Sequence, residues 1–229
     1  MLTTLIIGLA TSSALWIGAL LGAYWKPPQW LVGLLIAFAS GALITALGDE
    51  LFGHAIEIGG LLPSALGLIG GALLFLGIDH IIEKRDGGES GMGLLASVTV
   101  DGVPENLALG VALIGQQTSA ILALLVAICL ANLPEALSGA SEMQEEGHKR
   151  KTTLLLWGGV GVLLILAVIL GNTLLSAASD ELLAVVQSLA AGGVLASLAI
   201  TLMPQAYHKS HQAVAFATVA GFLLTFALK

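Results

Sequence analysis

Long apolar stretches separated by short polar ones run along the whole chain. A helix that crosses the hydrocarbon core of a bilayer needs about 20 apolar residues. Each of the stretches reaches roughly this length, and their boundaries are expected to hold to within about three residues. The pattern predicts an all-α membrane protein, one transmembrane domain over residues 1–229, with eight helices at approximately 2–25, 30–53, 61–82, 92–115, 118–141, 152–175, 182–204 and 211–228.

The composition agrees with this prediction and narrows the classes of partner. Of the 229 residues 57% are hydrophobic and 10% are charged, whereas a soluble domain has roughly 25% charged residues. Residues 1–24 lack a basic first segment and a cleavage site, so they are expected to form a membrane span rather than a removed signal peptide. The net charge of -7 and the lack of a basic patch argue against nucleic acid as a partner. The single cysteine, Cys129, excludes an intrachain disulfide and a zinc finger.

The positions of the basic residues predict how the chain is oriented. Cytoplasmic loops of membrane proteins carry an excess of Lys and Arg. With the N-terminus outside, every basic residue except Lys229 falls on the cytoplasmic side. We therefore expect both termini outside, in the cell membrane, with the longest cytoplasmic loop at 142–151 and a short loop at Tyr207–Ser210. The basic residues assigned to the cytoplasm are Lys26, Lys84, Arg85, Lys149, Arg150, Lys151 and Lys209.

Two acidic residues lie in the middle of the fourth predicted helix. Asp101 and Glu105 are four residues apart, so they project from the same helical face. An ionisable side chain at this depth costs about 2.5–3.5 kcal/mol on insertion scales. The pair is therefore expected to face the interior of the bundle or a water-filled cavity, with Asn106 beside it.

The fifth predicted helix repeats the pattern, with Asn132 and Glu135 three residues apart. Each glutamate directly follows a proline, Pro104 or Pro134, and a proline frees one backbone carbonyl in a helix. At membrane depth such freed groups are tolerated where they find partners or line a cavity. The connection at 116–118 is short, so the two helices are expected to be antiparallel neighbours whose polar faces meet.

These five side chains predict a site for a divalent cation. Carboxylate and amide oxygens are hard donors that suit such ions. The ion is expected as a transported substrate, with no prosthetic group, and the protein is not expected to be an enzyme, because the G-x-G-D motif of an intramembrane aspartyl protease is lacking. A structural alternative is that the prolines kink the helices and the acids form hydrogen bonds in their protonated forms. The predicted ligands are Asp101, Glu105, Asn106, Asn132 and Glu135.

The two motif helices resemble the ZIP (Zrt/Irt-like) family of divalent metal transporters. The family has H-N-x-P-E-G in its fourth helix and a related H-x-x-P-E-G in its fifth, where this chain has D-G-V-P-E-N at 101–106 and A-N-L-P-E-A at 131–136. The glycine-rich segments at 39–41 and 191–193 are also similar to that family. The resemblance implies eight helices in a 3+2+3 arrangement with inverted repeats, both termini outside, and metal transport toward the cytoplasm.

The chain departs from the family at the residues that would select the metal. Asp101 and Ala131 stand where the family has its motif histidines, and Gly102 and Asn106 replace an asparagine and a glycine. The loss of imidazole leaves an oxygen shell, which favours harder ions such as manganese or iron. Zinc also accepts carboxylate ligands, so it stays among the expected substrates.

Further polar residues lie at the helix ends. Asp49, Glu50 and His54 at the outer end of the second helix predict either a solvated end or an entrance that concentrates cations. On the cytoplasmic side, Asp79 and His80 end the third helix and His208 follows the seventh. They predict an exit path or ordinary solvation.

Two other functions are compatible with the same residues. The first is a membrane scaffold or metal sensor with a ZIP-like fold that moves no ion, and the second is a proton- or sodium-coupled carrier of another solute. The sequence leaves open which metal is bound and whether the chain forms a homodimer.

Overall fold

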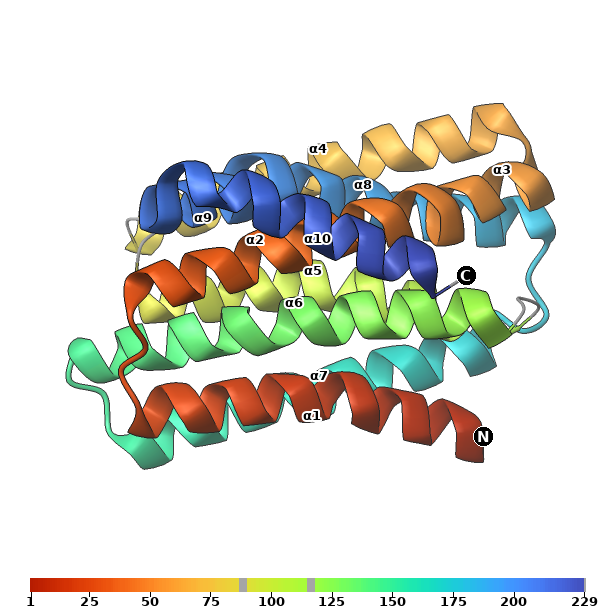
Figure 1. The fold of residues 1–229 in the computed structure, drawn as a ribbon. Helices are drawn as coiled ribbons and strands as arrows, with labels where there is room; N and C mark the ends of the chain where they lie inside the picture. The colour runs from red at the N-terminus through yellow and green to blue at the C-terminus, as the bar shows by residue number, and fades with distance from the viewer. Residues whose placement is uncertain (87–89, 115–117, 229) are drawn as a thin grey trace.

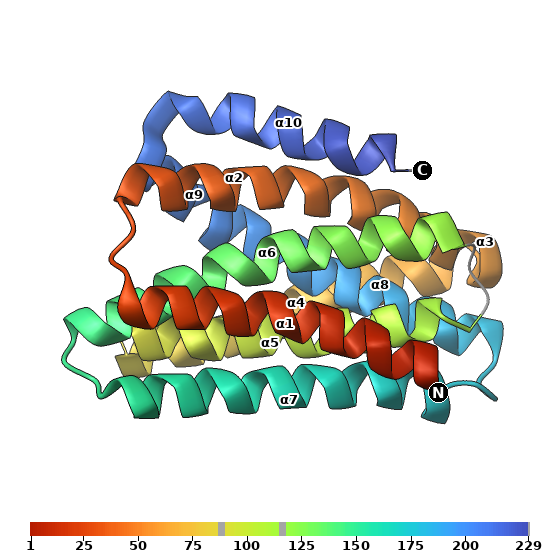
Figure 2. The ribbon, with the colours of Figure 1, turned by 60° about the horizontal axis from the view of Figure 1, so that its bottom comes forward.

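The computed structural model describes residues 1–86, 90–114 and 118–228, and within these ranges the chain is helical, with no strand. Figures 1 and 2 both show the helices running side by side along one axis. Their bounds are α1 Leu2–Tyr24, α2 Gln29–Ala46, η1 Leu47–Gly53, α3 His54–Gly59, α4 Leu61–Asp86, α5 Gly91–Ala112, α6 Thr118–Glu145, α7 Arg150–Leu174, α8 Asp180–Ser197, η2 Leu198–Leu202, α9 Met203–Ser210, η3 His211–Ala213 and α10 Val214–Ala227.

Six helical stretches among the described residues are long and apolar enough to cross a membrane. This supports the prediction of an all-α membrane protein, while eight spans stays a prediction. The helix α5 is not among the six, because polar side chains interrupt its apolar sequence. The last stretch, 180–227, contains both α8–α9 and α10, and the chain turns between them at His211, whose φ is 51°.

Of two predicted loops, one is shorter than expected and the other is helical. The linker expected at 142–151 is shorter than predicted, because α6 continues to Glu145 and α7 begins at Arg150. Glutamate and glutamine favour helix, so α6 extends beyond its apolar part until Gly147 adopts a φ of 87°. The loop expected at Tyr207–Ser210 belongs to α9. The predicted connection at 116–117 lies outside the described residues.

The helices pack in two equivalent sets around α5 and α6. The helix α1 packs on α6 and α7, and α7 in turn packs on α5. Likewise α2 packs on α10 and α6, whereas α8 packs on α4 and α5. Exchanging the first three helical stretches (α1, α2–α3 and α4) for the last three (α7, α8–α9 and α10), and α5 for α6, therefore reproduces these contacts.

Glycine allows the closest of these approaches, at the α2–α10 and α4–α8 contacts. A Cβ atom placed on either glycine of each contact would lie 1.8–1.9 Å from a carbonyl oxygen of the facing helix. Small residues of this kind let membrane helices approach closely. The facing pairs are Gly41 with Thr218, Gly221 with Phe38, Gly71 with Leu189, and Gly192 with Leu68.

Two π-helical segments, η1 and η2, interrupt the second and the seventh helical stretch. The segment η1 follows α2 and continues into α3, and η2 joins α8 to α9. Their backbone hydrogen bonds run from residue i to i+5, which widens the turn and is frequent at functional sites. The sequence did not predict either segment.

Candidate functional site

Asp101 lies in the middle of α5 and links this helix to α8. Its Oδ2 accepts a hydrogen bond from the Ser197 hydroxyl at 2.5 Å. Within the described residues its other carboxylate oxygen, Oδ1, is buried and has no hydrogen-bond partner. The site therefore includes α8 as well as α5 and α6, the two helices that the sequence predicted.

Glu105 and Asn106 occupy the next turn of α5. Glu105 is 4% exposed and Asn106 is fully buried. The Asn106 amide donates to the Gly102 carbonyl at 2.9 Å. Among the described groups, neither Glu105 Oε1 nor Asn106 Oδ1 has a hydrogen-bond partner. Since a buried polar atom without a partner is costly, these oxygens together with Asp101 Oδ1 require a cation, a proton or a water molecule.

Glu135 of α6 shares a small cavity with Asp101. The cavity has a volume of about 10 Å³, which is room for about one water molecule. Glu105 does not line this cavity, but its carboxyl group interacts electrostatically with those of Asp101 and Glu135. Two of the three acids that the sequence singled out therefore line one cavity, and the third interacts electrostatically with both. Besides Asp101 and Glu135, the polar residues that line the small cavity are Ser97, Ser138, Thr201 and Gln205.

Asn132 is directed toward a different neighbour. It is 2% exposed, and its amide nitrogen donates to the Thr11 carbonyl of α1 at 3.2 Å. This contact ties α6 to α1. Asn132 is therefore close in sequence to Glu135, but its described hydrogen bond is one between helices.

A larger cavity of about 700 Å³ opens next to the small one, toward the ends of α6 and α9. We call it the inner cavity, and its side the inner side, because that end of the bundle carries the basic loops. Leu94, Thr201 and Gln205 line both cavities. Polar residues therefore line both cavities between the Asp101–Glu135 pair and the end of the bundle that carries the basic loops, and we call this series the polar path. The inner cavity is lined by Gln29, Leu94, Glu142, Ile200, Thr201, Pro204, Gln205, His208 and Lys209.

Polar side chains follow each other at helical spacing along both sides of this path. Ser197, Thr201 and Gln205 succeed one another every four residues on α8, η2 and α9. Glu135, Ser138 and Glu142 do so at steps of three and four on α6. Residues at these spacings lie on one helical face, so each helix presents one polar stripe to the cavities.

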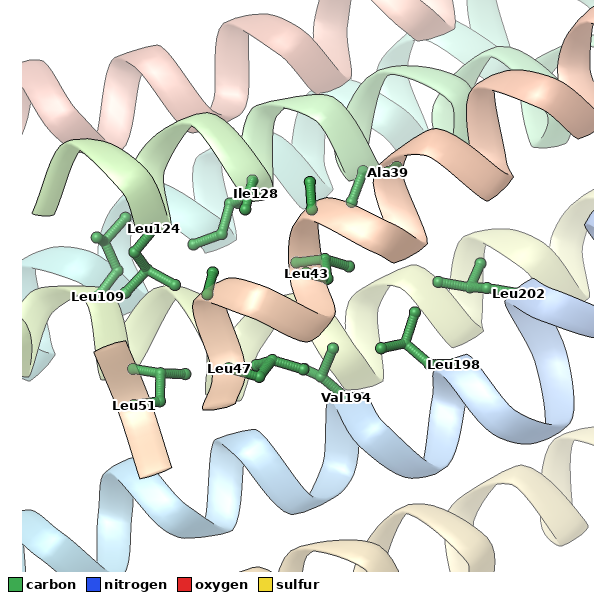
Figure 3. Packing of buried hydrophobic residues seen from close by; sticks show 14 of the residues in the cluster. Ala39, Leu43, Leu47, Leu51, Leu109, Leu124, Ile128, Val194, Leu198 and Leu202 are labelled. Atoms are coloured by element: carbon green, nitrogen blue, oxygen red, sulfur yellow. The ribbon is translucent and has the colours of Figure 1, made fainter. Parts of the chain in front are cut away.

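Leucine and other apolar side chains, which we call the apolar layer, lie between the carboxylates and η1. Asp101 also lines a separate cavity of about 220 Å³ between α4, α5 and α8. Leu109 lies one turn beyond Glu105 on α5, and Ile128 one turn beyond Asn132 on α6. Both are fully buried. Figure 3 shows them packed with side chains from α2, η1 and α8. The apolar layer comprises Leu43, Leu47, Leu51, Leu109, Leu124, Ile128 and Val194.

The three predicted entrance residues lie beyond this layer and in different environments. Asp49 is exposed, whereas Glu50, its neighbour in η1, is 8% exposed. His54 in α3 is partly buried, and its Nδ1 lies 3.0 Å from Oε1 of the buried Gln187 on α8. The prediction of a solvated helix end therefore fits the exposed Asp49 but not the buried Glu50.

The predicted exit residues are also separated. Asp79 of α4 is partly buried and interacts electrostatically with Asp101. His80 is exposed on the same helix, and His208 is exposed and lines the inner cavity. Of the three, only His208 lies on the polar path.

Sequence reasoning missed Ser197, Gln205 and Lys209. One signal was available for Gln205, because Pro204–Gln205 repeats the proline-then-polar pattern of Pro104–Glu105 and Pro134–Glu135. A lone serine such as Ser197 in an apolar helix gives no such signal, since serine is common at helix contacts in membranes.

The donor set fits a hard cation better than a soft one. In the described part of the chain, no three His, Cys, Asp or Glu side chains form a group that could hold a metal ion. A cation at Asp101 and Glu135 would therefore draw on hydroxyl and amide oxygens as well, or on Glu105 after a rearrangement. Oxygen shells of this type suit ions such as manganese or magnesium.

Comparisons with known proteins add no relative. No protein-family model matches the chain, and no curated protein is significantly similar to it.

Proposed function

We propose that the chain transports divalent metal cations across a cell membrane, toward the cytoplasm, with the ion passing Asp101, Glu105 and Glu135. The observation that carries the proposal is the set of buried acceptor oxygens on α5, at Asp101, Glu105 and Asn106, for which the described residues supply no donor. A divalent ion compensates several carboxylates at once, which a hydrogen-bond donor does not.

The distribution of cavities supports a transport role. The carboxylates are reached from the inner cavity through Thr201 and Gln205 and are separated from Asp49 by the apolar layer. A carrier that exposes its site to one side at a time has such an asymmetry in each of its states. Inverted repeats around a central site are common among transporters, and the equivalent packing of the first and last three helical stretches supports this plan.

The resemblance to the ZIP family gives the proposal its expected topology. It implies eight spans in a 3+2+3 arrangement, both termini outside, and manganese, iron or zinc as substrates. The topology and the substrates are part of the proposal. They rest on Pro104–Glu105 and Pro134–Glu135, which match the family motifs.

A second candidate function is a membrane scaffold or metal sensor of the same fold that moves no ion. The observation in its favour is that no group of three metal-binding acidic, histidine or cysteine side chains is found in the described ranges.

Uptake of Mn²⁺ and Zn²⁺ into proteoliposomes separates the two candidates. The native chain is expected to fill the vesicles, and Glu105→Gln is expected to reduce uptake to the level of empty vesicles. Glu57→Gln changes an exposed glutamate of α3 and is expected to transport like the native chain. A well-folded native protein that moves neither ion would favour the scaffold or sensor, and unchanged uptake by Glu105→Gln would remove Glu105 from the site.

A further inference from the structure

A lysine lies beside the polar path, between the small cavity and the inner cavity. The ammonium group of Lys209 donates to the Ser138 hydroxyl at 2.7 Å and to Glu142 Oε1 at 3.3 Å. The Ser138 hydroxyl also donates to the same Glu142 oxygen at 3.0 Å. One cation on α9 is thus held by two oxygen ligands that are one turn apart on α6.

This group is largely withdrawn from water. The Lys209 side chain is 11% exposed and that of Glu142 is 24% exposed. A partly buried ion pair costs desolvation, and the removal of one partner leaves the other charge uncompensated. Without Lys209, the Glu142 carboxylate would therefore attract another cation from the cavity that it lines.

The position of the ammonium group matters for an ion that leaves the carboxylates. Ser138 lines the small cavity with Asp101 and Glu135, and Glu142 lines the inner cavity. An ion that moves from one cavity to the other therefore passes the two side chains that hold Lys209. Gln205 and His208 line the inner cavity as well and could complete the shell of a cation there.

We propose that Ser138 and Glu142 form a second cation site on the inner side of the carboxylates, and that Lys209 occupies it as a tethered competitor. A divalent cation takes the place of the ammonium group when it arrives from Asp101 and Glu135. Lys209 returns when the ion enters the inner cavity, so the ion is not retained at Glu142. The order of these steps rests on the proposed transport function, whereas the existence of the second site does not.

Titration calorimetry of the full chain with Mn²⁺ tests the site. Lys209→Met is expected to bind one more Mn²⁺ ion per chain than the native protein, because the Glu142 carboxylate becomes available. The double variant Lys209→Met/Glu142→Gln is expected to lose that ion again. Lys209→Arg keeps a cation in place and is expected to bind as the native chain does. An unchanged number of bound ions in Lys209→Met would overturn the proposal.

The titration of the native chain tests the proposed function, whereas the titrations of the variants test the second site. A native chain that binds no Mn²⁺ contradicts the proposed function. The second site is then supported if Lys209→Met gains an ion that the double variant loses, and it is contradicted if Lys209→Met gains none.

A second measurement needs no variant at Lys209 and so does not depend on whether Lys209→Met folds. The rate at which an amine-reactive ester acylates Lys209 is measured by peptide mass spectrometry with and without Mn²⁺, with the exposed Lys151 as the internal reference. Brief displacement by Mn²⁺, in too few chains at any moment to add a bound ion in the calorimetry, is expected to accelerate acylation of the otherwise protected Lys209 several-fold relative to Lys151. An unchanged or lower rate would contradict displacement.

Discussion

The helices around Asp101 and Glu135 present opposite environments on the two sides of these carboxyl groups. On the inner side, serine, threonine, glutamine and glutamate line two neighbouring cavities that share lining residues. On the outer side, the same helices contribute the fully buried Leu109, Leu124 and Ile128 to the apolar layer.

The difference between the polar and the apolar side shows that the type of side chain on each helix, and not a break in the helices, determines from which side the carboxyl groups are reached. On α6, Ile128 belongs to the closed side, and Ser138, ten positions later in the same continuous helix, belongs to the open one. Under the proposed transport function, the side chains of the apolar layer would have to separate in order to expose the carboxylates to the opposite end of the bundle. The tests below act on one side or the other.

The largest effect is expected from the carboxylates that separate the two sides. Asp101→Asn keeps the size of the side chain and removes one charge that a divalent ion would compensate. Changing groups that merely orient a metal ligand costs about 10–100-fold, so for a direct ligand we expect Mn²⁺ uptake into proteoliposomes to fall by about 100-fold or more. Equal uptake by this variant and by the Glu57→Gln control would show that charge at Asp101 does not matter.

Chemical accessibility tests the two sides directly. In a chain whose own cysteine is removed by Cys129→Ala, Thr201→Cys is expected to react with a membrane-impermeant thiol reagent added on the inner side, because Thr201 lines both cavities. Leu43→Cys is expected to stay unmodified from either side, because Leu43 is 1% exposed within the apolar layer. The extent of labelling is read by mass spectrometry. Rapid labelling at Leu43→Cys would show that the layer opens without a substrate.

A smaller, structural effect is expected from weakening the apolar layer. Leu109→Ala removes a side chain that is 0% exposed, and such a cavity costs about 2–5 kcal/mol. Leu170→Ala removes the same atoms from a side chain that is 45% exposed, for which we expect a change of about 0.5 kcal/mol. Denaturant unfolding in detergent measures both. Equal losses would mean that Leu109 packs no more tightly than a residue on the surface of α7.

The smallest effect is expected at the contact between α8 and the site. Ser197→Ala removes the hydroxyl that donates to Asp101 Oδ2 but leaves the carboxylate in place. A group that orients a ligand in this way contributes about tenfold to metal affinity, which corresponds to about 1.4 kcal/mol. Calorimetric titration with Mn²⁺ checks the value. A loss as large as that of Asp101→Asn would make Ser197 a ligand itself.

The apolar stretches and the acids within them could be read from the sequence. Hydrophobic length predicted the helical stretches, and the spacing of Asp101, Glu105 and Glu135 predicted that these acids face the interior of the bundle, because a charge at membrane depth has few other places to go. Asp101 and Glu135 line one cavity, whereas Glu105 does not line it. The aspartate and the two glutamates are rare residue types in such a context, and this rarity made them visible.

The rest depended on tertiary contacts that leave little trace in the sequence. Ser197 reaches Asp101 from a helix that begins nearly 80 positions later in the chain, and nothing in its own segment marks it. Lys209 was assigned to a loop because a lysine after an apolar stretch usually ends a span. It is instead helical and turned toward Ser138 and Glu142, since both helices continue beyond their apolar parts.

The π-helical segments affect which side of the helix faces the buried hydrophobic cluster. In an α-helix, residues four apart drift around the axis by about 40° at each step. Leu43, Leu47 and Leu51 are spaced by four, as are Val194, Leu198 and Leu202, yet each trio stays within one buried cluster. The wider turns of η1 and η2 reduce the drift. His54 follows η1 directly, so the alignment of its Nδ1 with Oε1 of Gln187 depends on the wider turn of that segment.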